Sequence, residues 1–465
     1  MIKNFLFIYF FIIGQYIFPC YTYSQSISIT SDKSFEYFQK GRQFLKKGKT
    51  EQAITYFEQA VFLNPEKIKY KKSLAKAYIK LSNVLCSKTK FSDALKWAKK
   101  AYSIYSNEET KDNIALIYKE NAIHLLEKNK FKEAAKKIEI ALSLSPLNQE
   151  IKETELNVKL RYGLSLSSDD RKKIFLKLLK RHPDSDLTME LLGDAYYYED
   201  EDLNNAIKYY TLSVKINPEN DTALIKLKKA ENDFKNEKNY KKSKYSHFTV
   251  KYEGYEKTEL AWSVLNILNE AYSSLKNKIG FYSKKKLSVI IYTEEKYKNV
   301  TGVEWSAGLY DGKIRVRESD ITTGDKINLK NLLYHEYTHA LIFERVGNKL
   351  PVWVNEGFAQ LFEPSIKWNN NIRNYLKDTV DSYEWIPFNS LDQSWNILKT
   401  EKQVTQAYMQ SFAAAYYITK LGSDYSIVKI LDNMNSGESF EKSLKRILGI
   451  DLKLFEINFK DFIRK

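Results

Sequence analysis

The sequence predicts an α-helical superhelix of stacked helix pairs followed by an α+β domain. A chain of 465 residues exceeds what one hydrophobic core usually organises, so more than one domain is expected. Residues 34–235 repeat a helix-pair pattern of small and large apolar side chains. Residues 246–465 combine strand-like segments with amphipathic helices. Between these parts, the polar and basic run 236–245 breaks the periodicity and predicts a linker.

The N-terminal residues 1–24 predict an export signal. Lys3 precedes an almost wholly apolar run, residues 5–18, which is short for a membrane span and typical of a secretory signal. With cleavage expected after Ser24, the protein would reach the periplasm, the cell envelope or the extracellular space. An uncleaved N-terminal anchor is the alternative. Lipidation of Cys20 is a further one, although the residues before it match a lipidation motif poorly.

The repeated pattern in the first half has the spacing of two antiparallel helices. In its clearest unit the small and large positions are held by Tyr37, Gly41, Phe44, Ala53, Phe57, Ala60 and Pro65. Further units are predicted at 70–106, 115–146, 150–183 and 187–218, the last with one additional residue in its turn. A polar helix near 220–235 would close the array.

These units resemble tetratricopeptide repeats (TPRs). The resemblance implies a superhelix whose concave face binds a partner protein or an extended peptide. A spacer that only positions the second half of the chain is the alternative.

Composition limits the classes of partner. The net charge is +16 and is carried mostly by lysines scattered along predicted helices. No nucleic-acid-binding motif accompanies this charge, so a nucleic-acid partner is not expected. Association with an anionic membrane surface stays open, as does the simpler interpretation of lysine-rich solvated helix faces. Without the signal, Cys86 is the remaining cysteine, which excludes an intramolecular disulfide.

A zinc-binding pattern lies in the second half of the chain. His335 and His339 are four residues apart, so a helix places both imidazoles on one face, with Glu336 beside them. Glu356 follows on a second predicted helix that begins at Val352. Two nitrogen ligands and one carboxylate would hold one Zn²⁺ and leave its fourth position for water. The first helix is predicted to start with Asn328 as its cap and to end at Gly347.

The segments 335–341 and 351–359 resemble the gluzincin zinc metallopeptidases, most closely the peptidase MA-like family. The resemblance extends over residues 246–465 and implies a zincin-like α+β fold with peptidase activity. Glu336 would then be the general base. Segment 406–411 is similar to a late helix of this family, which implies that Tyr408 donates a hydrogen bond to the oxyanion; Tyr310 and Tyr337 are competing candidates.

Two details qualify this resemblance. Many gluzincins place an acidic residue four positions after the third ligand, where this chain has Gln360, so weaker metal binding is expected. Asp311-Gly312 predicts a hairpin turn. Either of its strands could pair with the substrate backbone, and the alternative is that both serve only for pairing within the sheet. The strands before it are predicted at 248–252, half-exposed, and at 287–292.

The sequence therefore predicts an exported zinc metallopeptidase that hydrolyses peptide bonds and docks its substrate or a partner on the TPR region. A TPR interaction scaffold with an inactive zincin-like domain is the alternative.

Overall fold

The structure is a computed structural model that describes residues 22–465, except 284–285, 302–307, 383, 393–394, 396–397 and 424. The predicted export signal lies outside the described residues apart from its last three positions, which begin helix α1. The chain forms two compact units, Met1–Asp184 and Ser185–Lys465. Among the described residues, no helix combines the length and the apolar character needed to cross a membrane.

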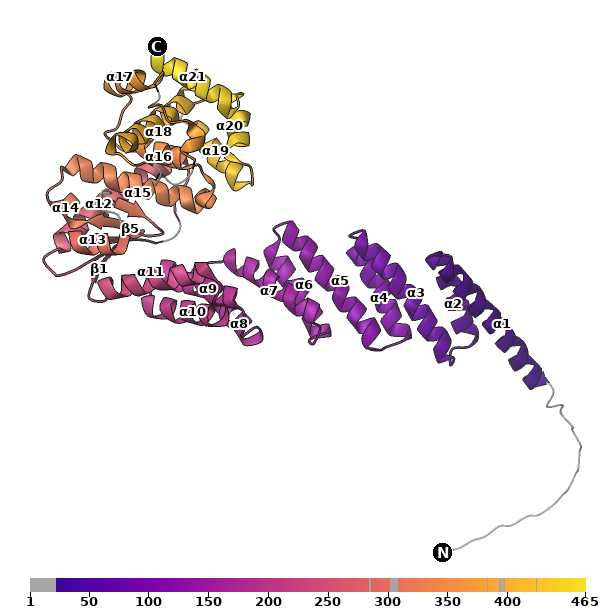
Figure 1. Cartoon of the computed structure of the whole chain (residues 1–465). Coiled ribbons are helices and arrows are strands. Elements are labelled where there is room, and N and C mark those ends of the chain that lie inside the picture. Colours follow the sequence, from indigo (N-terminus) through magenta and orange to yellow (C-terminus); the bar gives the residue numbers. More distant parts are fainter. Residues whose placement is uncertain are drawn as a thin grey trace, which may run out of the picture. The chain divides into compact units, whose positions relative to one another are not determined.

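The first unit consists of antiparallel helix pairs, seen as stacked indigo to magenta ribbons in Figure 1. Gly41 of the first helix lies so close to the ring of Phe57 that an added Cβ would be 2.7 Å from it, so only glycine permits this approach of the two helices. The pairs have these bounds: α1 (Thr22–Lys46) and α2 (Thr50–Leu63); α3 (Ile68–Ser87) and α4 (Phe91–Ile104); α5 (Glu108–Glu127) and α6 (Phe131–Leu144); α7 (Gln149–Leu164) and α8 (Ser168–Arg181).

The second unit begins with one more helix pair. The additional residue expected near its turn coincides with a π-helical segment, a form that takes up extra residues within a helix. The predicted closing helix is present as α11. The elements are α9 (Asp186–Asp194), η1 (Ala195–Asp200), α10 (Leu203–Ile216) and α11 (Asp221–Glu237).

A five-stranded sheet follows, with the strand order β1-β2-β3-β5-β4. The strands β2, β3 and β5 are parallel to one another, and each edge strand is antiparallel to its neighbour. The hairpin predicted around Asp311-Gly312 is present as β4 and β5, with Tyr310 opposite Ile314. The strands are β1 (Lys241–Tyr245), β2 (Phe248–Tyr252), β3 (Leu287–Tyr292), β4 (Gly308–Tyr310) and β5 (Ile314–Arg317).

Two predictions about this region are wrong. Half of the segment 236–245, predicted as a linker, forms the edge strand β1; its lysines look like a linker in sequence, but charged side chains are common on strand edges. Strand β2 is buried along its whole length instead of half-exposed. Its polar residues face α11, where Lys251 lies 3.3 Å from a carboxylate oxygen of Glu237.

Helices complete the second unit. The helices α12 and α15 share an apolar core with the inner face of the sheet, and a second core gathers α16 to α21. The remaining elements are α12 (Thr258–Ile279), α13 (Glu294–Thr301), α14 (Glu318–Thr322), α15 (Lys326–Val346), η2 (Gly347–Lys349), α16 (Val352–Leu361), α17 (Asn370–Thr379), η3 (Phe388–Ser390), α18 (Glu401–Leu421), α19 (Tyr425–Asn435), α20 (Phe440–Leu448) and α21 (Leu452–Arg464).

Candidate functional site

Helix α15 carries both histidines of the predicted zinc pattern. Its cap is Asp325, whose side chain accepts a hydrogen bond from the N–H of Ile327 at 3.2 Å. The prediction that Asn328 caps the helix is therefore wrong, because the aspartate upstream already satisfies a free N–H of the first turn. The helix ends at Gly347, as predicted, with a φ of +64° that favours glycine.

Helix α16 carries Glu356 and packs against both α15 and α18. The next residue, Gly357, meets the backbone of α18: an added Cβ would lie 2.3 Å from the carbonyl oxygen of Ser411. A backbone carbonyl cannot rotate away as a side chain can. Glycine at this position therefore allows the two helices the close approach seen here.

The side chains of His335, His339 and Glu356 converge, each offering one ligand atom. The two Nε2 atoms are 3.0 Å apart, and Oε2 of Glu356 lies 3.3 Å from Nε2 of His335 and 3.5 Å from Nε2 of His339. Bonds of about 2.0–2.1 Å to a tetrahedral Zn²⁺ require ligand separations of about 3.3 Å. The donor set and its spacing thus fit one zinc ion.

Glu363 orients the first histidine of this group. Nδ1 of His335 lies 2.8 Å from Oε1 of Glu363. A carboxylate only accepts, so the imidazole proton sits on Nδ1 and Nε2 keeps its lone pair for a metal. The sequence analysis missed Glu363. Gln360, at the position where many gluzincins have an acidic residue, makes no such contact: its Oε1 is buried without a hydrogen-bond partner among the described residues, as is Nδ1 of His339.

The pKa values of the two glutamates next to the histidines are shifted in opposite directions. Burial would raise the pKa of Glu356, but the adjacent imidazoles outweigh it and hold that pKa far below its usual range. Burial raises the pKa of Glu336, with the carboxylates of Glu356 and Glu363 adding to it, and the histidines only partly oppose this. Glu356 is therefore suited to remain an anionic ligand, whereas Glu336 is suited to accept a proton.

Comparison with known families agrees with this geometry. The profile of the Peptidase MA superfamily matches residues 267–465, and that of the tetratricopeptide repeat matches residues 37–67 and 188–220. This chain carries a Peptidase MA superfamily domain preceded by tetratricopeptide repeats. The predicted fold class, a helical TPR region followed by an α+β peptidase domain, is thereby confirmed.

Individual proteins similar to this chain are also known. The uncharacterized protein YhcO of Bacillus subtilis (strain 168) is 29% identical over 207 residues, which are 42% of this chain and 54% of that protein. The chain thus spans about half the length of this relative. Among solved structures, the TPR protein YrrB, described as having an unusual peptide-binding site, is 17% identical with a TM-score of 0.24, over 44% of this chain and 97% of that one. PilF of Pseudomonas aeruginosa is 21% identical with a TM-score of 0.23, over 45% and 86%.

Within the Peptidase MA domain, Tyr408 of α18 interacts electrostatically with the carboxylates of the site. Its pKa is raised, first by burial and then by the carboxylates of Glu356, Glu336 and Glu363. Its ring packs edge-on against Trp395, with 4.9 Å between the ring centroids. A phenol with a raised pKa stays protonated and can donate a hydrogen bond.

The two competing tyrosines have other surroundings. Burial also raises the pKa of Tyr310, but its carboxylate neighbours are Glu344 and Asp311, away from the histidines. Tyr337 is buried in the core between α15 and the sheet, where its ring packs against Phe248. Of the three tyrosines, Tyr408 alone has the site carboxylates among the causes of its pKa shift.

The sheet offers one edge strand beside the histidine helix. Strand β5 lies between β3 and β4, so its backbone is paired on both sides. Strand β4 is at the edge of the sheet and contacts α15. The sequence left both hairpin strands open for substrate pairing. Within the described part of the sheet, β4 is the one with an unpaired side.

Proposed function

We propose that this protein is an exported zinc-dependent peptidase whose single Zn²⁺ is held by His335, His339 and Glu356. The observation that carries this proposal is the convergence of the three side chains at tetrahedral spacing, with Glu363 fixing the tautomer of one histidine. When bound there, zinc lowers the pKa of a coordinated water and polarises the scissile carbonyl.

In this proposal Glu336, Tyr408 and the edge of β4 each have a separate role in catalysis or substrate binding. Glu336, buried and with a raised pKa, accepts the proton of the attacking water and passes it to the leaving amine. Tyr408 donates its O–H to the oxyanion without carrying charge. The free edge of β4 holds an extended substrate by backbone hydrogen bonds, and side-chain pockets then select the sequence.

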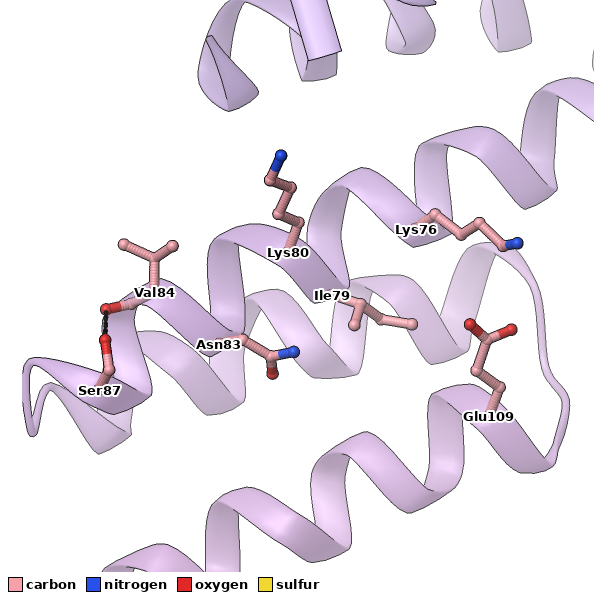
Figure 2. Close-up of a pocket in the computed structure, with 7 residues that line it drawn as sticks. All are labelled: Lys76, Ile79, Lys80, Asn83, Val84, Ser87 and Glu109. Carbon is pink, nitrogen blue, oxygen red and sulfur yellow. Dashed lines mark hydrogen bonds between the residues drawn. The ribbon is translucent and has the colours of Figure 1, made fainter. Parts of the chain in front are cut away.

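The tetratricopeptide repeats supply a protein-interaction surface, and we place the docking of substrate or partner on the face formed by their first helices. A pocket of about 450 Å³ opens there between α3 and the start of α5 (Figure 2). Lys76 and Lys80 point from α3 beside Ile79, and Asn83 offers an amide for a peptide backbone. Neither lysine has an ion-pair partner among the described residues, so an acidic segment of an extended peptide suits the pocket. Its full lining is Lys76, Ile79, Lys80, Asn83, Val84, Ser87 and Glu109.

Cleavage of a generic substrate tests the catalytic proposal. Casein, or a cell-envelope extract, is incubated with wild-type protein and with Glu336→Gln, and the products are mapped by mass spectrometry. The proposal is supported if wild-type protein forms cleavage products, if a zinc chelator prevents their formation, and if Glu336→Gln does not form them. Equal products from both proteins would exclude Glu336 as the base, whereas no products from either substrate would favour the alternative of an interaction scaffold with an inactive domain.

Charge reversal tests the docking proposal separately. Lys76→Glu with Lys80→Glu should slow cleavage of a folded client several-fold and leave cleavage of a short peptide unchanged. The matched control is Lys96→Glu with Lys99→Glu, which reverses two exposed lysines on α4 of the same helix pair. Equal effects of the two double variants would exclude the pocket as the docking site.

A further inference from the structure

The last repeat helices, through η1 and α11, pack against the outer face of the peptidase sheet. Arg315 of β5 is wholly buried, and its guanidinium makes a two-pronged contact with Asp233 of α11, from Nη1 to Oδ1 at 3.1 Å and from Nη2 to Oδ2 at 2.9 Å. Nη2 also donates to the hydroxyl of Tyr197 at 3.1 Å, and Nζ of Lys313 lies 3.2 Å from the same carboxylate. A buried bidentate pair of this kind fixes the orientation of the two side chains relative to each other as well as their contact.

The turn of the β4–β5 hairpin is held from the same side. Lys229 of α11 donates to the carbonyl oxygen of Asp311 at 2.9 Å and pairs with its carboxylate at 2.9 Å. The ring of Tyr198 packs on Gly312 so closely that an added Cβ would lie 2.3 Å from it. Side chains of η1 and α11 thus contact both residues at the tip of this hairpin.

Charge makes the two faces complementary. The repeat contributes three carboxylates and one ammonium to the buried or half-buried pairs of this interface, a formal net charge of −2, and the sheet contributes three cations and one carboxylate, a formal net charge of +2. Covering these cations with the repeat is unfavourable unless carboxylates pair with them, and the repeat supplies those carboxylates. The repeat side is Glu201, Lys229, Asp233 and Glu237, and the sheet side is Lys251, Asp311, Lys313 and Arg315.

We propose that this terminal repeat, α9 to α11, is a positioning element of the peptidase site: it holds the β4–β5 hairpin from outside, so that the free edge of β4 keeps its register beside α15 for an extended peptide. The proposal rests on the peptidase function proposed above. Tyr198 and Asp233 act through the hairpin and touch neither the substrate nor the metal ligands. The consequence is that displacing the repeat weakens peptide binding while the metal site stays intact.

The test uses full-length protein with Gly312→Ala, whose new methyl group presses on Tyr198. The matched control is Gly280→Ala, which has a similarly left-handed backbone, φ +68° against +99°, but open space around it. Gly312→Ala should raise KM for a peptide about tenfold with less than a twofold change in kcat and with unchanged zinc content. Tyr198→Ala alone, which removes the packed ring and leaves residue 312 a glycine, should also raise KM with little change in kcat.

A second readout does not depend on activity. Hydrogen–deuterium exchange of residues 308–317 should be faster in Gly312→Ala than in Gly280→Ala, with exchange in α15 unchanged. If the wild type cleaves nothing, this difference still supports a held hairpin, and only the proposed function fails. The positioning role is overturned if Gly312→Ala and Gly280→Ala have the same KM, or the same exchange in the hairpin.

Discussion

Glu363 contacts His335 through Nδ1 at 2.8 Å, although it lies beyond the end of the helix that carries Glu356. This contact fixes the direction in which Nε2 of the histidine points, toward the carboxylate of Glu356 and the other imidazole. The glutamate therefore prepares the site before any ion is bound.

Loss of this contact should weaken zinc binding. We expect Glu363→Gln to lower zinc affinity about 10- to 100-fold, because the amide no longer fixes the imidazole tautomer. Competition titration with a chromophoric chelator measures the affinity. Gln360→Ala is the control, and it should have a smaller effect because its side-chain oxygen contacts no described polar group. A larger loss of zinc affinity in Gln360→Ala than in Glu363→Gln would assign the support of the metal site to Gln360 instead of Glu363.

Removal of the hydroxyl of Tyr408 should slow the chemical step. We expect Tyr408→Phe to lower kcat about 10²-fold or more with little change in KM, since oxyanion donors act mainly in the transition state. Steady-state kinetics on one peptide measure both constants. Tyr310→Phe should leave kcat unchanged, and a large effect of that variant would make Tyr310 the better candidate.

A methyl group at Gly357 should separate α16 from α18. The clash with the carbonyl oxygen of Ser411 is expected to destabilise the second unit by about 1–3 kcal/mol. Because Glu356 is the preceding residue, Gly357→Ala should also reduce zinc affinity. Gly41→Ala crowds the ring of Phe57 in the first unit and should destabilise without affecting zinc. Equal zinc affinity in both variants, measured together with thermal unfolding, would contradict this explanation.

Neutralising Asp233 should be costly for stability. Asp233→Asn removes the carboxylate that Lys313 and Arg315 share. Arg315 keeps Asp311 and Glu237, but Lys313 is left buried without an ion pair among the described residues, which is expected to cost about 3–5 kcal/mol. Denaturant unfolding measures the change. Asp381→Asn removes an exposed partner of Arg464 and should change stability little, since exposed pairs contribute little. Similar losses in the two variants would show that burial of the network is unimportant.

The same aspartate predicts acid sensitivity. Burial would raise the pKa of Asp233, but Arg315 and Lys313 outweigh it and hold that pKa well below its usual range. A carboxyl with a lowered folded-state pKa contributes stability that is complete above its unfolded pKa of about 3.9 and is lost as the pH falls below it. Unfolding free energy measured between pH 6 and pH 3 should therefore fall more steeply in wild type than in Asp233→Asn, and equal slopes would contradict this.

Local patterns predicted the parts of the site that depend on local geometry. The spacing of His335 and His339 specifies one helix face, and Asp311-Gly312 specifies a tight turn. Glu363 could not be found in this way, because its approach depends on how the chain turns after α16. The burial of Asp233 was equally hidden, since a polar helix normally faces solvent and only the packing of α11 on the sheet reveals its partners.

Zinc stoichiometry tests the central claim most directly. Metal analysis by mass spectrometry of protein purified with zinc and then dialysed should give one Zn²⁺ per wild-type chain, one per Glu336→Gln chain, and none in His335→Ala. Wild-type protein without zinc, or unchanged zinc in His335→Ala, would contradict a metal held between α15 and α16.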